Sequence, residues 1–231
     1  MSSGRRRGPL WRFTSGFTGR SRERRFGMFM ATMSPSATDR LLDIGVTDLT
    51  TRSSNFLEAG YPWPESIVAV APGPVPAFRA TFPNVAFVQA DGRQLPFADG
   101  EFDIGFSNAV IEHVGSREEQ RRFVAEIART CRRAFVCTPN SRFPIDPHTL
   151  LPFVHWLPRR LRHPLLRMTG NGIWATEQML NPLSASALLA LYPRDVPVRL
   201  VRQRMFGLTS VLIAVSGEPA GGEPGTSDRD A

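Results

Sequence analysis

The chain contains no lysine, so its 28 basic residues are all arginines. It also has only two cysteines and no long hydrophobic run. No apolar run approaches the roughly 20 residues that a membrane-spanning helix needs, and we expect no transmembrane segment. Cys131 and Cys137 are too few for a disulfide framework, so we expect both to be reduced and buried. No secretory-type apolar segment is visible either. These absences predict a cytoplasmic protein stabilised by an ordinary hydrophobic core.

The positive charge lies almost entirely in the N-terminal part of the chain. Residues 1–40 carry nine arginines against Glu23 and Asp39, whereas the remainder is balanced. We predict a basic, partly disordered segment over residues 1–38, which is either a solvated tail or a patch attracted to an anionic surface such as phospholipid headgroups or nucleic acid. Residues 217–231 are rich in Gly, Pro, Glu and Asp and are predicted to be a disordered tail.

Between these ends, strand and helix patterns alternate. Short apolar runs of the kind found in buried parallel sheets occur at residues 40–44, 67–71, 85–90, 103–108 and 134–138. Helices are predicted over residues 53–60, 116–131 and 184–192, the second opened by the capping box Ser116-Arg117-Glu118-Glu119. Two final strands, 196–203 and 208–216, surround a Phe206-Gly207 turn. The order predicts a doubly wound α/β fold.

Two motifs lie where such a fold binds ligands, at the carboxyl ends of its strands. The first is Leu41-Leu42-Asp43-Ile44-Gly45, an apolar strand ending in Asp-x-Gly. The second is Asp91-Gly92, followed by Leu95-Pro96-Phe97 and Phe102-Asp103. The dinucleotide fingerprint Gly-x-Gly-x-x-Gly is missing, which argues against a nicotinamide or flavin cofactor.

Together these motifs resemble the class I S-adenosylmethionine (SAM)-dependent methyltransferases of the type 11-like group. The resemblance covers residues 39–216 and implies a Rossmann-like seven-stranded sheet, with five parallel strands and a C-terminal antiparallel hairpin. It implies SAM as cofactor, with Asp91 accepting the adenine amine. The implied cofactor-binding residues are Asp43, Gly45, Thr47, Asp48, Ala71, Asp91, Gly92, Ser107 and Asn108.

The chain departs from the family pattern at two points. The loop after the first strand has one glycine where two or three are usual. Ala71 stands where the family carries an acid that binds both ribose hydroxyls, and Asp48 is a candidate substitute. These departures keep open a second interpretation, in which the chain is a catalytically silent SAM-fold binding or scaffold protein.

The stretch from Thr138-Pro139-Asn140 to Trp156-Leu157-Pro158 is similar to small methyltransferases of bacterial surface-polysaccharide and glycolipid gene clusters. Residues 139–180 are therefore expected to form an acceptor-site insertion, either solvated on its basic face or facing phosphate or a membrane.

The expected reaction is O-methylation of a sugar, glycolipid or related small acceptor. His148, and secondarily His113, are the candidate general bases. No metal is expected, because potential ligands do not cluster along the sequence. Nucleic acid is not an expected partner, because Ser107-Asn108-Ala109-Val110 lacks the Asn/Asp-Pro-Pro-aromatic motif of nucleic-acid amino-methyltransferases.

Overall fold

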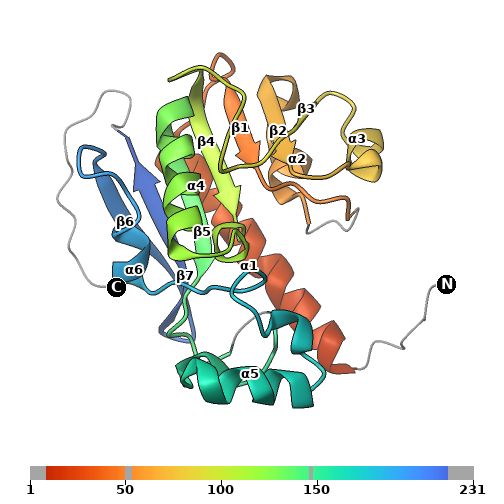
Figure 1. The fold of residues 1–231 in the computed structure, drawn as a ribbon. Coiled ribbons are helices and arrows are strands. Elements are labelled where there is room, and N and C mark those ends of the chain that lie inside the picture. Colours follow the sequence, from red (N-terminus) through yellow and green to blue (C-terminus); the bar gives the residue numbers. More distant parts are fainter. Residues whose placement is uncertain (1–8, 50–53, 146–147, 218–231) are drawn as a thin grey trace.

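The computed structural model describes residues 9–49, 54–145 and 148–217, with only the backbone described for residues 9–18. Its centre is a seven-stranded sheet in the order β3-β2-β1-β4-β5-β7-β6 (Figure 1). The strands are β1 (Leu41–Ile44), β2 (Ile67–Ala71), β3 (Ala86–Gln89), β4 (Phe102–Asn108), β5 (Cys131–Pro139), β6 (Val198–Met205) and β7 (Leu208–Ser216).

Strands β1 to β5 run parallel, and β7 inserts antiparallel between β5 and β6. The order reverses at β1 and β4, which are neighbours in the sheet although β2 and β3 lie between them in sequence. The crevice at such a reversal is the usual ligand site of a doubly wound fold. The predicted architecture, five parallel strands completed by a C-terminal antiparallel hairpin, is confirmed.

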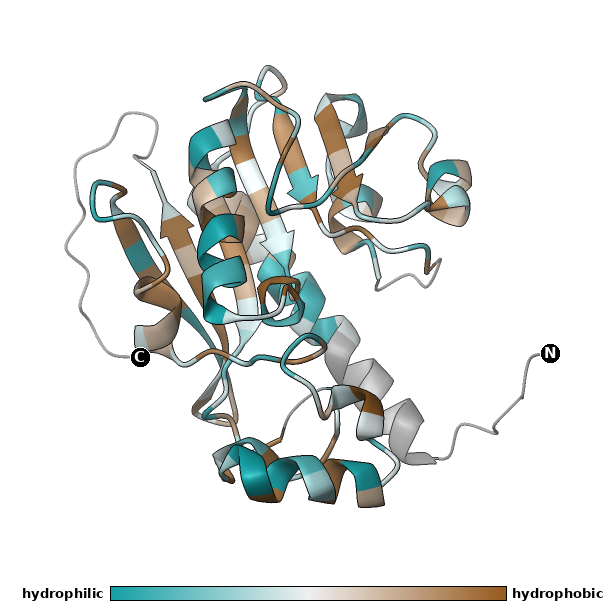
Figure 2. Cartoon of the chain, viewed as in Figure 1, coloured by the Kyte–Doolittle hydropathy of each residue, from teal (hydrophilic) through white to brown (hydrophobic). Residues whose placement is uncertain are grey.

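The sheet has a separate hydrophobic core on each face, because successive side chains of a buried strand point to opposite sides. Leu41 packs into the core that contains Phe106 and Phe135, whereas Leu42 packs into the core that contains Phe123 and Val136. All of these side chains are at most 2% exposed. The central strands are accordingly mostly apolar, with a few polar positions such as Asp43 in β1 (Figure 2).

Helices cover both faces of the sheet. They are α2 (Phe56–Gly60), α3 (Pro76–Thr81), α4 (Arg117–Thr130) and α6 (Ala185–Leu189), with short 3-10 turns η1 (Pro64–Ser66) and η2 (Ile111–His113). Helix α4 begins with the predicted capping box, in which Ser116 and Glu119 each accept a backbone amide of the other. Its apolar residues Phe123, Val124 and Ile127 are fully buried. Cys131 and Cys137 are free and buried, as predicted.

The N-terminal segment differs from the prediction of partial disorder over residues 1–38. Residues Pro9–Met33 form one long helix, α1, which crosses beside the sheet (Figure 1). Its C-terminal half packs Phe29 and Met33 into the first core, where both are at most 1% exposed. The prediction rested on the number of arginines in this segment and gave no packing role to its apolar residues. Residues 1–8, and the predicted tail from residue 218 onward, lie outside the described residues.

The insertion after β5 forms a small lobe facing the carboxyl ends of the parallel strands (Figure 1). It contains η3 (Val154–Trp156), α5 (Arg159–Met168) and η4 (Gly172–Trp174), held by a third cluster of Val154, Leu166 and Ala175. Within the described part of the chain, none of the helices combines the length and apolar character needed to cross a bilayer.

Candidate active site

The loop after β1 brings Asp43 and Gly45 to the carboxyl edge of the sheet. Gly45 has a φ of +107°, a conformation that favours glycine. A Cβ at Gly45 would also collide with the side chain of Val110, at 2.2 Å from its Cγ2. Glycine is therefore required here both by the backbone conformation and by the close approach of the segment after β4.

A second carboxyl group, which the sequence analysis missed, lies beside Asp43. Glu58 of α2 is 5% exposed and Asp43 is 6% exposed. Burial, together with the neighbouring carboxyl of Glu58, raises the pKa of Asp43 well above its usual range. Burial also raises the pKa of Glu58. Both Glu58 oxygens are buried, and the Asp43 carboxyl is their side-chain partner. The two carboxyls form a buried acidic pair beside the glycine loop.

Asn55 holds the rest of this loop in place. Its side-chain oxygen accepts the Thr47 amide at 3.1 Å, and its side-chain nitrogen donates to the Thr47 and Leu49 carbonyls at 2.9 and 3.2 Å. Thr47 is thus held through its backbone by Asn55. A pocket opens here, lined by Asp43, Gly45, Val46, Ser54, Asn55, Phe56, Leu57, Glu58, Phe106 and Asn108.

The candidates for ribose contact have other surroundings. Ala71, at the end of β2, is 4% exposed, and its methyl side chain provides no carboxylate for the ribose. The Asp48 carboxylate accepts the backbone amides of Ala77 and Phe78 at 2.6 and 3.1 Å, and so caps the first turn of α3. Asp48 is thus engaged structurally, and the structure does not bring it forward as a replacement acid.

Asp91, the candidate adenine acceptor, is paired with Arg93. The Arg93 side chain donates to both carboxylate oxygens at 2.6 to 3.1 Å, and its backbone amide adds a bond of 2.9 Å. The Arg93 hydrogen bonds keep the pKa of Asp91 low. Arg93 also pairs with Glu119 of α4. Gly92 serves packing, because a Cβ there would lie 2.6 Å from the Phe123 ring.

At the end of β4, Ser107 and Asn108 have different roles. The Ser107 hydroxyl is fully buried and donates to the Ile44 carbonyl at 3.0 Å, so it joins β4 to β1. The Asn108 side-chain oxygen lines the pocket and accepts a hydrogen bond from Arg25 of α1. Arg25 is 7% exposed and also donates to Gln203 of β6 at 3.1 Å.

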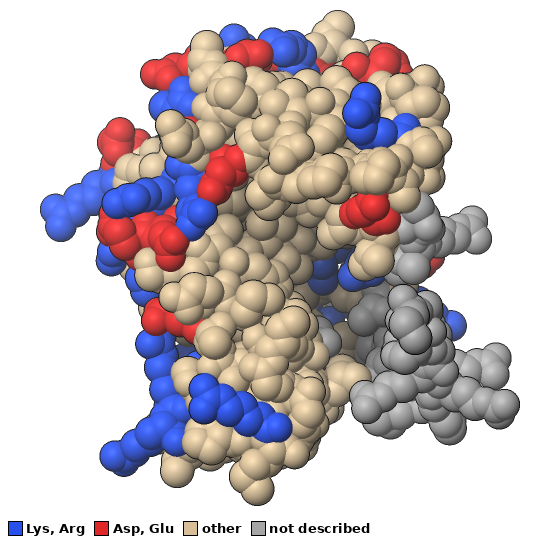
Figure 3. Space-filling view, turned by 45° about the vertical axis from the view of Figure 1, so that its right-hand side comes forward, with Lys and Arg blue, Asp and Glu red and all other residues tan. Residues whose placement is uncertain are grey.

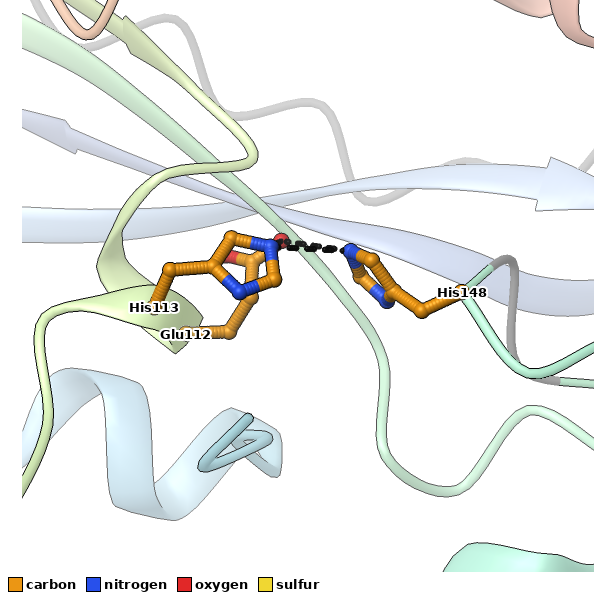
Figure 4. A group of neighbouring side chains, drawn as sticks. All are labelled: Glu112, His113 and His148. Carbon is orange, nitrogen blue, oxygen red and sulfur yellow. Dashed lines mark hydrogen bonds and ion pairs between the residues drawn. The ribbon is translucent and has the colours of Figure 1, made fainter. Parts of the chain in front are cut away.

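The two candidate bases meet, although 35 residues separate them. The Nε2 atoms of His113 and His148 lie 2.9 Å apart, and each is 3.9 Å from Oε1 of Glu112 (Figure 4). Glu112 is 1% exposed, and its other oxygen accepts the Thr138 hydroxyl at 2.9 Å. The Trp174 ring lies 5.2 to 5.7 Å from both imidazoles. Three possible metal ligands are thus brought together by the fold, which the sequence analysis did not anticipate.

The far end of the insertion is tied to this cluster. The Met179 carbonyl lies 2.6 Å from Nδ1 of His113, and the Asn181 amide donates to the Glu112 carbonyl at 2.7 Å. The Asn181 side chain adds a bond of 2.8 Å to the Gly115 carbonyl. These contacts fix η2 against the insertion.

Comparison with known proteins agrees with this geometry. Residues 53–134 match the family model described as a methyltransferase domain. No curated protein matches the chain. The seven-stranded sheet is similar in fold to that of solved SAM-dependent methyltransferases.

Three solved structures illustrate the likeness. A SAM-dependent methyltransferase from Methanosarcina mazei is 14% identical, with 83% of this chain and 98% of that chain covered and a TM-score of 0.52. PH0226 from Pyrococcus horikoshii is 16% identical, with coverages of 86% and 90% and a TM-score of 0.57. The 1,6-didemethyltoxoflavin-N1-methyltransferase of Burkholderia thailandensis, solved with S-adenosylhomocysteine, is 14% identical, with coverages of 95% and 94% and a TM-score of 0.52. At these identities the likeness concerns the fold of the domain.

Three residues of the site were missed by sequence reasoning. Glu58 lies among apolar residues of a short helix. An acid in such a setting indicates a buried carboxyl, so Glu58 could have been found from the sequence. Glu112 directly precedes His113, so it could have been included in that motif. Arg25 is one of nine arginines in the first forty residues, and nothing local distinguishes it from the others.

Proposed function

We propose that this domain binds SAM and transfers its methyl group to a hydroxyl of a small sugar or lipid-linked acceptor. The observation that carries the proposal is the buried Asp43–Glu58 pair beside Gly45. Asp43 lies in β1, and His113 of the histidine pair follows β4, which is the neighbour of β1 in the sheet. SAM carries an ammonium and a sulfonium, and buried carboxyls without a counter-charge suit a cationic ligand. These residues therefore fit the methionine half of the cofactor.

The fit is weaker at the nucleoside half. Ala71 offers no carboxylate for the ribose, and Asp48 already caps α3. Asp91 keeps a side chain that is 45% exposed, and we propose that it accepts the adenine amine while Arg93 holds its orientation. This combination predicts a cofactor site dominated by the amino-acid end of the ligand.

When bound, SAM supplies a methyl group that its sulfonium has already activated. The chain has to align the acceptor oxygen and exclude water. We propose that the acceptor hydroxyl binds beside His113 and His148, where the two imidazoles can receive its proton. Glu112 and the Met179 carbonyl hold the pair in position.

The insertion suggests the kind of acceptor. Helix α5 has one buried residue, Leu166, and exposes arginines together with apolar side chains. Figure 3 shows arginines projecting around this lobe. Large apolar side chains that are exposed on the lobe include Phe153, Trp156, Leu161, Leu165, Met168 and Ile173. Arginines beside apolar side chains are typical of helices that lie on anionic membranes. We propose peripheral contact with such a surface, consistent with a lipid-linked acceptor.

A second function is favoured by Ala71 and the capping role of Asp48. Without a ribose acid, the domain could bind SAM weakly or not at all and serve as a silent scaffold. Calorimetry with SAM and S-adenosylhomocysteine separates the two. We expect binding of both, with Asp43→Asn and Asp91→Ala each weakening it by roughly 1–3 kcal/mol through lost hydrogen bonds. No heat and no thermal shift at millimolar ligand would favour the silent protein.

A further inference from the structure

A cation site is indicated at the acceptor side of the domain. We infer that Glu112, His113 and His148 bind one divalent first-row transition ion, with Zn²⁺ the best match. Their ligand atoms come from η2 and from the insertion and lie within 4.8 Å of one another (Figure 4). Two imidazoles and one carboxylate are ligands that zinc and its neighbours prefer.

The spacing of the three atoms fits such an ion. The two Nε2 atoms and Oε1 of Glu112 form a triangle with sides of 2.9, 3.9 and 3.9 Å. A tetrahedral ion with bonds of about 2.1 Å holds its ligand atoms about 3.4 Å apart. The two Nε2 atoms would therefore separate by about half an ångström, and each would move closer to Oε1 by a similar amount.

The ligands are also held as metal ligands usually are. A carbonyl can only accept a hydrogen bond, so the Met179 carbonyl fixes the proton of His113 on Nδ1 and leaves Nε2 with its lone pair toward the cluster. Thr138 donates to Oε2 of Glu112 and orients Oε1. Such outer hydrogen bonds set tautomer and direction in metal sites.

The unsatisfied oxygen of Glu112 distinguishes a cation from a simple histidine hydrogen bond. Oε1 is buried without a hydrogen-bond partner among the described residues. A bond between the two imidazoles leaves this oxygen unsatisfied, whereas an ion between the three atoms satisfies all of them. The side chains of His113 and His148 are 29% and 15% exposed, so further coordination positions are open to solvent.

An open position has a consequence that rests on the proposed function. A divalent ion there can hold the acceptor hydroxyl by its oxygen and favour loss of the hydroxyl proton to solvent, as metals do for bound water. In the ion-bound form, His113 and His148 act as ligands and do not receive that proton. The acceptor would then be held both by coordination to the ion and by contacts with the insertion.

The test uses the full chain without a histidine tag, stripped with EDTA and dialysed. Titration with Co²⁺, followed by visible absorption, and with Zn²⁺, followed by calorimetry, should both give one ion per chain. We expect His113→Ala, His148→Ala and Glu112→Gln each to weaken binding at least ten-fold. His163→Ala, a histidine of α5 outside the cluster, is the matched control and should bind normally.

Two results would overturn the inference: no binding of either ion at micromolar protein, or binding that persists unchanged in the His113→Ala and His148→Ala variants. Zn²⁺ should also raise the melting temperature of the parent and of His163→Ala but not of the ligand variants, which guards against variants that merely fold poorly. S-adenosylhomocysteine is titrated on the same samples. Binding of the metal without binding of S-adenosylhomocysteine would contradict the proposed function and support the metal site. Binding of S-adenosylhomocysteine without binding of the metal would contradict the metal site and support the proposed function.

Discussion

The guanidinium of Arg25 contacts the side-chain oxygen of Asn108, linking α1 to the end of β4. It also donates to Gln203 of β6, so one buried cation serves two strands that are not neighbours in the sheet. This contact positions Asn108 at the pocket.

Arg25→Ala should therefore destabilise the domain. The change leaves the buried Gln203 oxygen and the half-buried Asn108 oxygen without this donor, which costs roughly 1–3 kcal/mol. Denaturant unfolding measures the loss. Arg24→Ala, one residue away and exposed, should change stability by no more than about 0.5 kcal/mol. Equal effects of the two substitutions would show that the buried contact contributes nothing.

Gly92 and Gly27 should respond to alanine in opposite ways. A Cβ at Gly92 would press on the Phe123 ring at 2.6 Å and on Ile44 at 3.0 Å, so we expect destabilisation of about 1–3 kcal/mol from overpacking. Gly27 lies in α1 with nothing within 4 Å of its Cβ position, so alanine should stabilise by about 0.5–1 kcal/mol. Thermal melts of both variants provide the comparison, and a stable Gly92→Ala variant would contradict the packing seen here.

The buried carboxyl pair should make stability depend on pH. The pKa values of Asp43 and Glu58 are raised in the folded chain, so the folded state binds protons more tightly than the unfolded state. The contribution of this pair to stability should be fully present at pH values below the ordinary carboxyl pKa and be lost as pH rises through the raised folded values. Glu58→Gln should flatten this fall and be more stable than the parent at alkaline pH. Parallel pH profiles of unfolding for the two proteins would refute the assignment.

Vesicle binding tests the basic lobe. The parent should co-sediment with anionic vesicles and be released as salt increases, because exposed charges are screened. Arg160→Glu with Arg167→Glu on α5 should remove most of the binding. Arg194→Glu with Arg199→Glu, which makes the same charge change near and on β6, should not. Identical losses in the two double variants would mean that net charge alone matters.

The sequence predicted the sheet well because its strands are buried on both faces and read as continuous apolar runs. Asp43, Gly45 and Asp91 could be located because each follows such a run. Contacts between distant segments could not be predicted. Arg93 donates hydrogen bonds to the Asp91 carboxylate, and Asp48 caps a helix that starts 28 residues later. His148 lies near Glu112 only because the insertion folds back toward η2. Side-chain partners depend on packing, and local patterns carry no information about them.

The docking of α1 also bears on the order of folding. The helix is synthesised before the sheet, yet its buried arginine bonds to Gln203, 178 residues later. The helix can complete its contacts only after β6 has been synthesised, and contacts between such distant residues form slowly. During synthesis, the apolar face bearing Phe29 and Met33 therefore stays without its final partners, and this interval is when the nascent chain is most exposed to aggregation.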